Sequence, residues 1–146
     1  MSTEIHVRTI ITDYNSHADE IRRIRNEVFL VEQAIDPADE YDDRDEACVW
    51  ALSFIDNEAV GTGRLDVEKN GKIGRVAVLV EHRRCGVGRR MMAAFEDYAR
   101  QSGELNKIWF HAQRSAVPFY LALDYSIESE EFMEADIPHV VMEKKL

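Results

Sequence analysis

Two glycines and four arginines in residues 83–90 have a spacing that suits the binding of a phosphate. Gly86 and Gly88 follow a β-branched run over residues 76–80, and a helical pattern of apolar residues begins directly after them. The first turn of a helix presents free backbone N–H groups and the positive end of the helix dipole. Glycine lets a phosphate approach this backbone without a Cβ in the way. The arginines around the turn are Arg83, Arg84, Arg89 and Arg90.

The spacing Arg83-x-x-Gly86-x-Gly88 differs from two common phosphate-binding motifs. A Walker A loop continues with Gly-Lys-Ser or Gly-Lys-Thr, and a dinucleotide-binding loop has a third glycine. Neither sequence is present. The simpler alternative is a glycine-containing turn with solvated arginines. The strand pattern before the turn and the amphipathic helix after it favour the phosphate site.

This turn resembles the R/Q-x-x-G-x-G/A motif of the GNAT family of N-acetyltransferases, which holds the pyrophosphate of coenzyme A. A second segment resembles the family sequence N-x-x-A-x-x-F-Y-x-x-x-G-F. The residues that match it are Ala116, Phe119 and Tyr120. Gln113 replaces the asparagine, and Asp-Tyr at residues 124–125 replaces Gly-Phe. Two motifs in the family's order make the resemblance more specific than either motif alone.

Further segments resemble bacterial GNAT proteins of the ElaA/YjcF type, so the likeness covers most of the chain. These segments are Val28-Phe29 with Glu32-Gln33, residues 73–78, 111–113 and 116–120, and Ile137-Pro-His with Met142. One departure is Arg84, which stands where the family has a glycine after the motif arginine.

The resemblance implies that acetyl-CoA binds along the strand and the turn. The backbone of residues 76–78 would pair with the amides of the pantetheine arm, as an added strand does. An N–H group near Val78 would polarise the thioester carbonyl, and residues 84–89 would hold the pyrophosphate. The expected cofactor-binding residues are Val76, Ala77, Val78, Arg83, Arg84, Cys85, Gly86, Val87, Gly88 and Arg89.

Tyr120 is the expected general acid. A phenol is protonated at neutral pH, so it can give its proton to the departing thiolate of CoA. The structural alternative is a core tyrosine on a short helix beside Phe119. The family resemblance favours the acid role.

The general base is harder to assign. Many GNAT enzymes place a glutamate on the fourth strand, but residues 74–78 read Gly-Arg-Val-Ala-Val. His111 could take a proton through water, and Glu32 or Glu27 could act as the base or bind a cationic amine. A structural histidine and a solvated helix face are the simpler interpretations. His139 receives no chemical role.

The composition is that of an ordinary globular protein, with 45% apolar and 32% charged residues. The 146 residues suit one domain over residues 1–146. No apolar stretch is long enough to cross a membrane, and the N-terminus lacks a signal-peptide pattern. The two cysteines, Cys48 and Cys85, favour reduced thiols in the cytoplasm.

The charge and the spacing of potential ligands narrow the range of partners. The net charge of −10 disfavours a nucleic-acid partner, because phosphates would be repelled. No His/Cys/Asp cluster has the ligand spacing of a zinc site, so no metal is expected.

The periodicity predicts a mixed α/β (α+β) domain, with a central sheet of six or seven strands and flanking helices. The resemblance makes this the GNAT acyl-CoA N-acyltransferase fold. The expected strands are 5–11, 47–55, 59–67, 72–80, 107–112, 126–133 and 140–144, and the expected helices are 18–31, 87–101 and 115–123. Gly61 and Gly63 lie inside a strand pattern and indicate a bulge.

Residues 36–46 are mostly acidic and are expected to form a solvated loop. In the GNAT arrangement this loop borders the acceptor side of the cleft. Together with Glu27 and Glu32 it would favour cationic amines. A loop that only aids solubility is the alternative.

These observations favour an N-acetyltransferase that moves the acetyl group of acetyl-CoA to a primary amine by direct transfer in a ternary complex. The acceptor would be a small molecule or an exposed amine, and a homodimer is left open. The missing glutamate favours a second hypothesis, a non-catalytic acyl-CoA-binding module that senses or regulates. A third is an acyl-homoserine-lactone-type synthase on a related fold, which would prefer longer acyl carriers.

Overall fold

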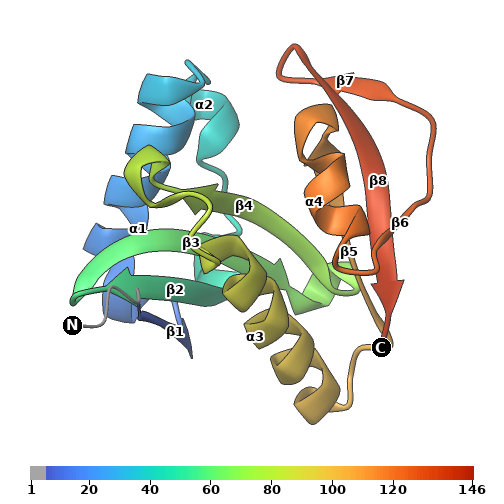
Figure 1. The fold of residues 1–146 in the computed structure, drawn as a ribbon, viewed down its shortest axis with the longest axis horizontal. Coiled ribbons are helices and arrows are strands. Elements are labelled where there is room, and N and C mark those ends of the chain that lie inside the picture. The colour runs from blue at the N-terminus through green and yellow to red at the C-terminus, as the bar shows by residue number, and fades with distance from the viewer. Residues whose placement is uncertain (1–5) are drawn as a thin grey trace.

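A computed structural model describes residues 6–146, and Ile5, expected in the first strand, lies outside them. Eight strands form one mixed sheet in the order β1-β2-β3-β4-β5-β8-β6, with β7 paired to β8 (Figure 1). β4 and β5 are parallel, and the other pairs are antiparallel. The strands are β1 (Val7–Thr12), β2 (Val49–Ile55), β3 (Glu58–Asp66), β4 (Lys72–Val78), β5 (Lys107–Gln113), β6 (Ser126–Ile127), β7 (Phe132–Glu134) and β8 (Ile137–Lys145). The predicted mixed sheet is confirmed.

The helices are α1 (Ala18–Arg25), α2 (Pro37–Glu40), α3 (Val87–Ser102) and α4 (Val117–Leu121). α1 continues into a π-helical segment, Asn26–Glu32, so the predicted helix over residues 18–31 is present in two parts. Its apolar face, with Ile21, Ile24 and Val28, is buried. α1 and α3 cover opposite faces of β2 and β3 (Figure 1).

α3 packs very closely on β3 because β3 contains glycines. A Cβ placed on Gly61 would lie 2.6 Å from Cγ1 of Val87, so any side chain there would force Val87 at the start of α3 to shift. The predicted irregularity of this strand is confirmed, since the register with β4 shifts between Thr62 and Arg64. Gly61 therefore helps to set the position of the arginine-rich turn that precedes α3.

The strand predicted over residues 126–133 is not continuous. It is divided into β6 and β7, because the segment between them pairs with β8 partly through a side chain. The N–H of Val141 donates to Oγ of Ser129 at 2.8 Å instead of to a backbone carbonyl. The chain then turns at Ala135 and Asp136, both with positive φ, and β7 and β8 form a hairpin.

The prediction of a solvated loop at residues 36–46 holds for most of its acids, but Glu40 and Asp45 are buried against arginines from other elements. Arg25 is 0% exposed and donates from Nε to Oε1 of Glu40 at 2.8 Å, and from Nη1 to Oδ2 of Asp45 at 2.9 Å. Arg64 donates to Asp42 at 2.7 Å and to Asp45 at 2.8 Å. Glu40, Asp42 and Asp45 thus neutralise arginines, whereas Asp36, Asp39, Asp43 and Glu46 stay exposed.

This network predicts a loss of stability in acid. The guanidinium of Arg64 holds the pKa of Asp42 well below its usual range, and Arg44 lowers the pKa of Asp66. A carboxyl whose pKa is lowered by folding stabilises the protein above its unfolded pKa of about 3.9, and this stabilisation is lost as the pH falls.

Urea unfolding from pH 7 to pH 2.5 measures this effect. We expect Asp42→Asn to cost on the order of 1 kcal/mol at pH 7, because Asp42 is partly exposed, and to cost less at pH 2.5. The neighbouring exposed carboxylate gives the control, Asp43→Asn, which should change little. An equal cost of Asp42→Asn at both pH values would contradict the ion-pair origin.

Candidate active site

The parallel strands β4 and β5 separate shortly after they meet. They pair at Lys72 with Trp109 and at Ile73 with Phe110. Beyond this point β4 bends at Arg75, which has a φ of 54° where the register with β3 shifts. A cleft of about 450 Å³ opens between the two strands. The edge of β4 beyond Ile73 thus faces the cleft instead of β5.

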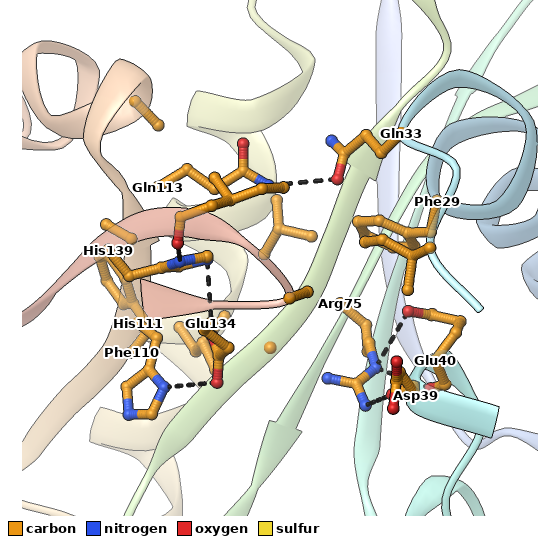
Figure 2. Close-up of a pocket in the computed structure, with 18 of the residues that line it drawn as sticks. Phe29, Gln33, Asp39, Glu40, Arg75, Phe110, His111, Gln113, Glu134 and His139 are labelled. Atoms are coloured by element: carbon orange, nitrogen blue, oxygen red, sulfur yellow. Dashed lines mark hydrogen bonds and ion pairs between the residues drawn. The ribbon is translucent and has the colours of Figure 1, made fainter. Parts of the chain in front are cut away.

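The cleft has two walls of different chemistry (Figure 2). On one side Phe29 comes from the π-helical segment and Gln33 directly follows it, and Nε of Arg75 on β4 lies 3.4 Å from Oε2 of Glu40. The opposite wall comes from β5, β7 and β8. Gln113 on that wall donates across the cleft to Oε1 of Gln33 at 3.2 Å.

Two histidines meet one carboxylate on the second wall. Nδ1 of His111 lies 3.1 Å from Oε1 of Glu134, and Nε2 of His139 lies 3.5 Å from Oε2 of the same residue (Figure 2). Phe132 contacts both rings, with centroid distances of 5.0 Å to His111 and 6.0 Å to His139. These four residues come from β5, β7 and β8.

Glu134 and His139 were not among the expected site residues. The sequence carries only a weak signal for them, because the β7–β8 turn at residues 135–136 is Ala-Asp and has no glycine to mark a hairpin. Had the hairpin been recognised, the pairing of Phe132 with His139 would have placed Glu134 near the histidines.

Tyr120 lies on α4 and lines the cleft. Its ring packs 4.4 Å from that of Phe110, and burial raises the pKa of Tyr120 to about 12. The hydroxyl therefore keeps its proton at neutral pH, as a general acid requires. Tyr120 is both a core residue and a wall of the cleft.

The arginine-rich turn has the geometry of an anion site. Gly86 is in the left-handed region with a φ of 84°, directly before the first turn of α3, and Arg84 and Arg89 are exposed. A Cβ placed on Gly88 would lie 3.2 Å from Phe119, so this end of α3 lies beside α4. The turn and Tyr120 are thereby brought to neighbouring parts of the fold.

Comparison with known proteins identifies the family. The family model described as "Acetyltransferase (GNAT) domain" matches residues 17–146. The chain belongs to the GNAT family. It is 37% identical over 123 residues to the N-acetyltransferase YjcF of Bacillus subtilis, covering 83% of this chain and 87% of that protein.

Solved structures show the same fold. Escherichia coli ElaA superposes with a TM-score of 0.83 at 24% identity, covering 94% of this chain and 99% of ElaA. A Bacillus anthracis protein crystallised in complex with acetyl coenzyme A has a TM-score of 0.60 at 19% identity, covering 68% of this chain and 63% of that chain. The predicted resemblance to the GNAT family, and to its ElaA/YjcF type, is confirmed.

In this GNAT domain Arg83 and Glu32 are bound to each other. Nη1 and Nη2 of Arg83 donate to the Glu32 carboxylate at 2.7 and 2.6 Å, and Nε donates to the carbonyl of Val78 at 2.9 Å. The hydrogen bonds from Arg83 lower the pKa of Glu32. Glu32 is therefore a weaker base than a free glutamate, and its partner Arg83 is less available to a phosphate than Arg84 or Arg89.

Some of the other predicted residues of the GNAT site line the cleft, and others lie outside it. Val76 and His111 line the cleft, and Ala77 and Val78 pair with β3 through their other edge. Glu27 lines a separate hollow on the outer side of α1. Glu27 is thus not placed to act in the cleft.

Two general features of the described part of the chain complete this picture. Within residues 6–146, no group of three or more His, Cys, Asp or Glu side chains is arranged to hold a metal ion. No helix among these residues is long and apolar enough to cross a membrane.

Proposed function

We propose that this GNAT protein transfers the acetyl group of acetyl-CoA to a primary amine by direct transfer in a ternary complex. The observation that carries this proposal is the separation of β4 from β5, which leaves a strand edge facing a cleft that Tyr120 and His111 also line. A pantetheine arm pairs with such an edge as an added strand. The acetyl coenzyme A bound to a protein of the same fold supports this choice of donor.

The residues present fit coenzyme A. The amides at the start of α3 and the side chains of Arg84 and Arg89 would hold the pyrophosphate, and Cys85, Gly86, Val87 and Gly88 supply the backbone around it. The β4 edge at residues 76–78 would hold the pantetheine amides, and a backbone N–H near Val78 would polarise the thioester carbonyl.

The transfer requires one proton to be removed and another to be supplied. The amine nitrogen attacks the thioester carbonyl, a C–N bond forms, and His111 accepts a proton from that nitrogen, directly or through water. The C–S bond then breaks, and Tyr120 gives its proton to the thiolate. The products are the N-acetylated amine and CoA.

The acceptor is a primary amine on a small molecule or on the surface of a larger one. The expected preference for cationic amines keeps only part of its basis, since Asp39 and Glu40 line the cleft but Glu40 and several of the other acids are paired. The acids of residues 36–46 that reach the core are paired with arginines, and Glu32 is paired with Arg83. The cytoplasm is the proposed location, since Cys48 and Cys85 are free thiols.

The alternative is a non-catalytic acyl-CoA-binding module. It is favoured by residues 74–78 of β4, which contain no carboxylate to serve as base. Turnover of acetyl-CoA with a panel of amines separates the two functions. Formation of N-acetylated product supports the enzyme, whereas tight CoA binding without product from any amine would support the module.

Binding of CoA should depend on Arg89 at the start of α3. We expect Arg89→Gln to weaken CoA binding roughly 10- to 100-fold, because a hydrogen bond between charged groups contributes about 1.5–3 kcal/mol. Calorimetry measures this, and higher salt should weaken wild-type binding because arginine–phosphate attraction is screened. Arg89 is a cleaner target than Gly86, whose positive φ would strain any side chain.

The same helix supplies the matched control. Arg100 is exposed near its other end and pairs with Asp97 and Glu96. Arg100→Gln should bind CoA as the wild type does. Equal affinities for wild type, Arg89→Gln and Arg100→Gln would show that the pyrophosphate does not lie beside Arg89.

A further inference from the structure

The arrangement of His111, Glu134 and His139 fixes where their protons lie. A carboxylate oxygen accepts hydrogen bonds, so the contact of 3.1 Å between Glu134 and Nδ1 of His111 places a hydrogen on Nδ1. In the neutral ring, Nε2 then carries the lone pair. His111 lines the cleft, and in this tautomer the nitrogen that can accept a proton is Nε2, on the side of the ring away from Glu134.

His139 is held by a hydrogen bond at one of its nitrogens. Its Nδ1 lies 2.7 Å from the carbonyl oxygen of Ile137, which can only accept, so Nδ1 donates. Its Nε2 lies 3.5 Å from Oε2 of Glu134. This separation is longer than a hydrogen bond, so His139 lies beside the carboxylate that accepts from His111 without being bonded to it.

The hairpin keeps these groups in place before any substrate binds. Phe132 and Glu134 are two residues apart on β7, so their side chains lie on the same face of the strand. In the pairing with β8, Phe132 lies opposite His139 and Glu134 opposite Ile137. Phe132 stacks on His139 with an angle of 23° between the rings and meets the ring of His111 at 78°. His139 is only 7% exposed, so its ring is held by packing as well as by the hydrogen bond from its Nδ1.

We propose that Glu134 is a positioning residue that fixes the tautomer of His111 and makes its Nε2 the proton acceptor for the attacking amine, with His139 packed beside the same carboxylate. This inference rests on the proposed acetyl transfer. When the C–N bond forms, the amine proton passes to Nε2 of His111, and the adjacent carboxylate stabilises the imidazolium. Tyr120 protonates the sulfur as the C–S bond breaks, and solvent returns the proton from His111 to Tyr120.

The kinetic test removes the charge and keeps the shape. Glu134→Gln retains an oxygen that can accept from His111 but cannot stabilise the imidazolium. We expect kcat to fall roughly 10- to 100-fold, part of the 10²–10⁴ that a positioned base contributes, with the KM for acetyl-CoA unchanged. The acidic limb of the kcat/KM profile should move to lower pH, because the imidazolium loses its counter-charge. A purely structural role would leave that limb in place.

A control variant shows whether the shift of the acidic limb is caused by the loss of the Glu134 charge. Glu131 is an exposed carboxylate just before β7 that pairs with Arg114, and Glu131→Gln should keep the wild-type rate and profile. The other titratable or charged groups that line the cleft are Lys72 and Arg75 on β4, Asp39 and Glu40 on α2, and Tyr120 on α4. All of these are unchanged in both variants.

A second measurement does not depend on turnover. Long-range proton–nitrogen correlation spectra of the imidazoles should show neutral His111 with its hydrogen on Nδ1 in the wild type, and loss of this preference in Glu134→Ala. A hydrogen on Nε2 in the wild type, or an active Glu134→Gln enzyme with unchanged kcat and pH profile, would overturn the inference. A wild type with the Nδ1–H tautomer but no acetyl transfer to any amine would instead reject the proposed function.

Discussion

Replacing Tyr120 with phenylalanine should lower kcat by about 10²–10⁴, the range for a positioned general acid, with little change in the binding of acetyl-CoA. The phenyl ring keeps the contacts of Tyr120 with Phe110 and Phe119, so the substitution removes mainly the proton. Because burial raises the pKa of Tyr120 to about 12, the acid stays protonated at every pH used for assay. Steady-state kinetics with saturating amine measures the effect.

Tyr125 provides the matched control for this substitution. Its ring lies 5.1 Å from that of Phe110, and its hydroxyl donates to Oε2 of Glu96 at 2.8 Å, which is a structural contact. Tyr125→Phe should change stability and leave kcat near the wild-type value. If Tyr120→Phe also retains wild-type kcat while chemistry limits the rate, Tyr120 is a core residue without a catalytic role.

The second large effect concerns stability. Arg25 is 0% exposed and lies between the carboxylates of Glu40 and Asp45. Arg25→Met should reduce the free energy of unfolding by about 3–5 kcal/mol, because the two buried carboxylates lose their shared partner and keep only Arg64 and Arg75. Urea denaturation at pH 7 measures the loss.

The same helix again offers a control. Arg22 is exposed on α1, and Arg22→Met should cost no more than about 0.5 kcal/mol, as surface substitutions usually do. Similar losses for the two variants would mean that the Arg25 network contributes nothing beyond an ordinary surface ion pair.

The parts of the fold that follow from local sequence were predictable. The helix over residues 87–101 was indicated by its apolar period and by Gly103, and the structure ends α3 at Ser102, with Gly103 in the left-handed region. Family motifs likewise indicated the turn before α3 and Tyr120. In each case the residues that carry the signal are neighbours in the chain.

The parts that depend on distant residues were not predictable in this way. Residues 36–46 appear solvated in composition, yet Arg25 and Arg64, from α1 and β3, bury Glu40 and Asp45. Glu134 reaches His111 only because β7 folds back on β8, which itself pairs with β5. Charge pairing between elements leaves no periodic trace in the sequence.

The separation of β4 from β5 also assigns donor binding and proton transfer to two consecutive parts of the chain. Every group proposed to hold the donor lies at or before Arg89, whereas Tyr120 and the His111–Glu134–His139 cluster all lie beyond the start of β5 at Lys107. The two parts meet at the cleft with little strand pairing between them. Substitutions in the β7–β8 hairpin can therefore change the residues that transfer protons and select the acceptor. The residues proposed to bind the cofactor stay the same.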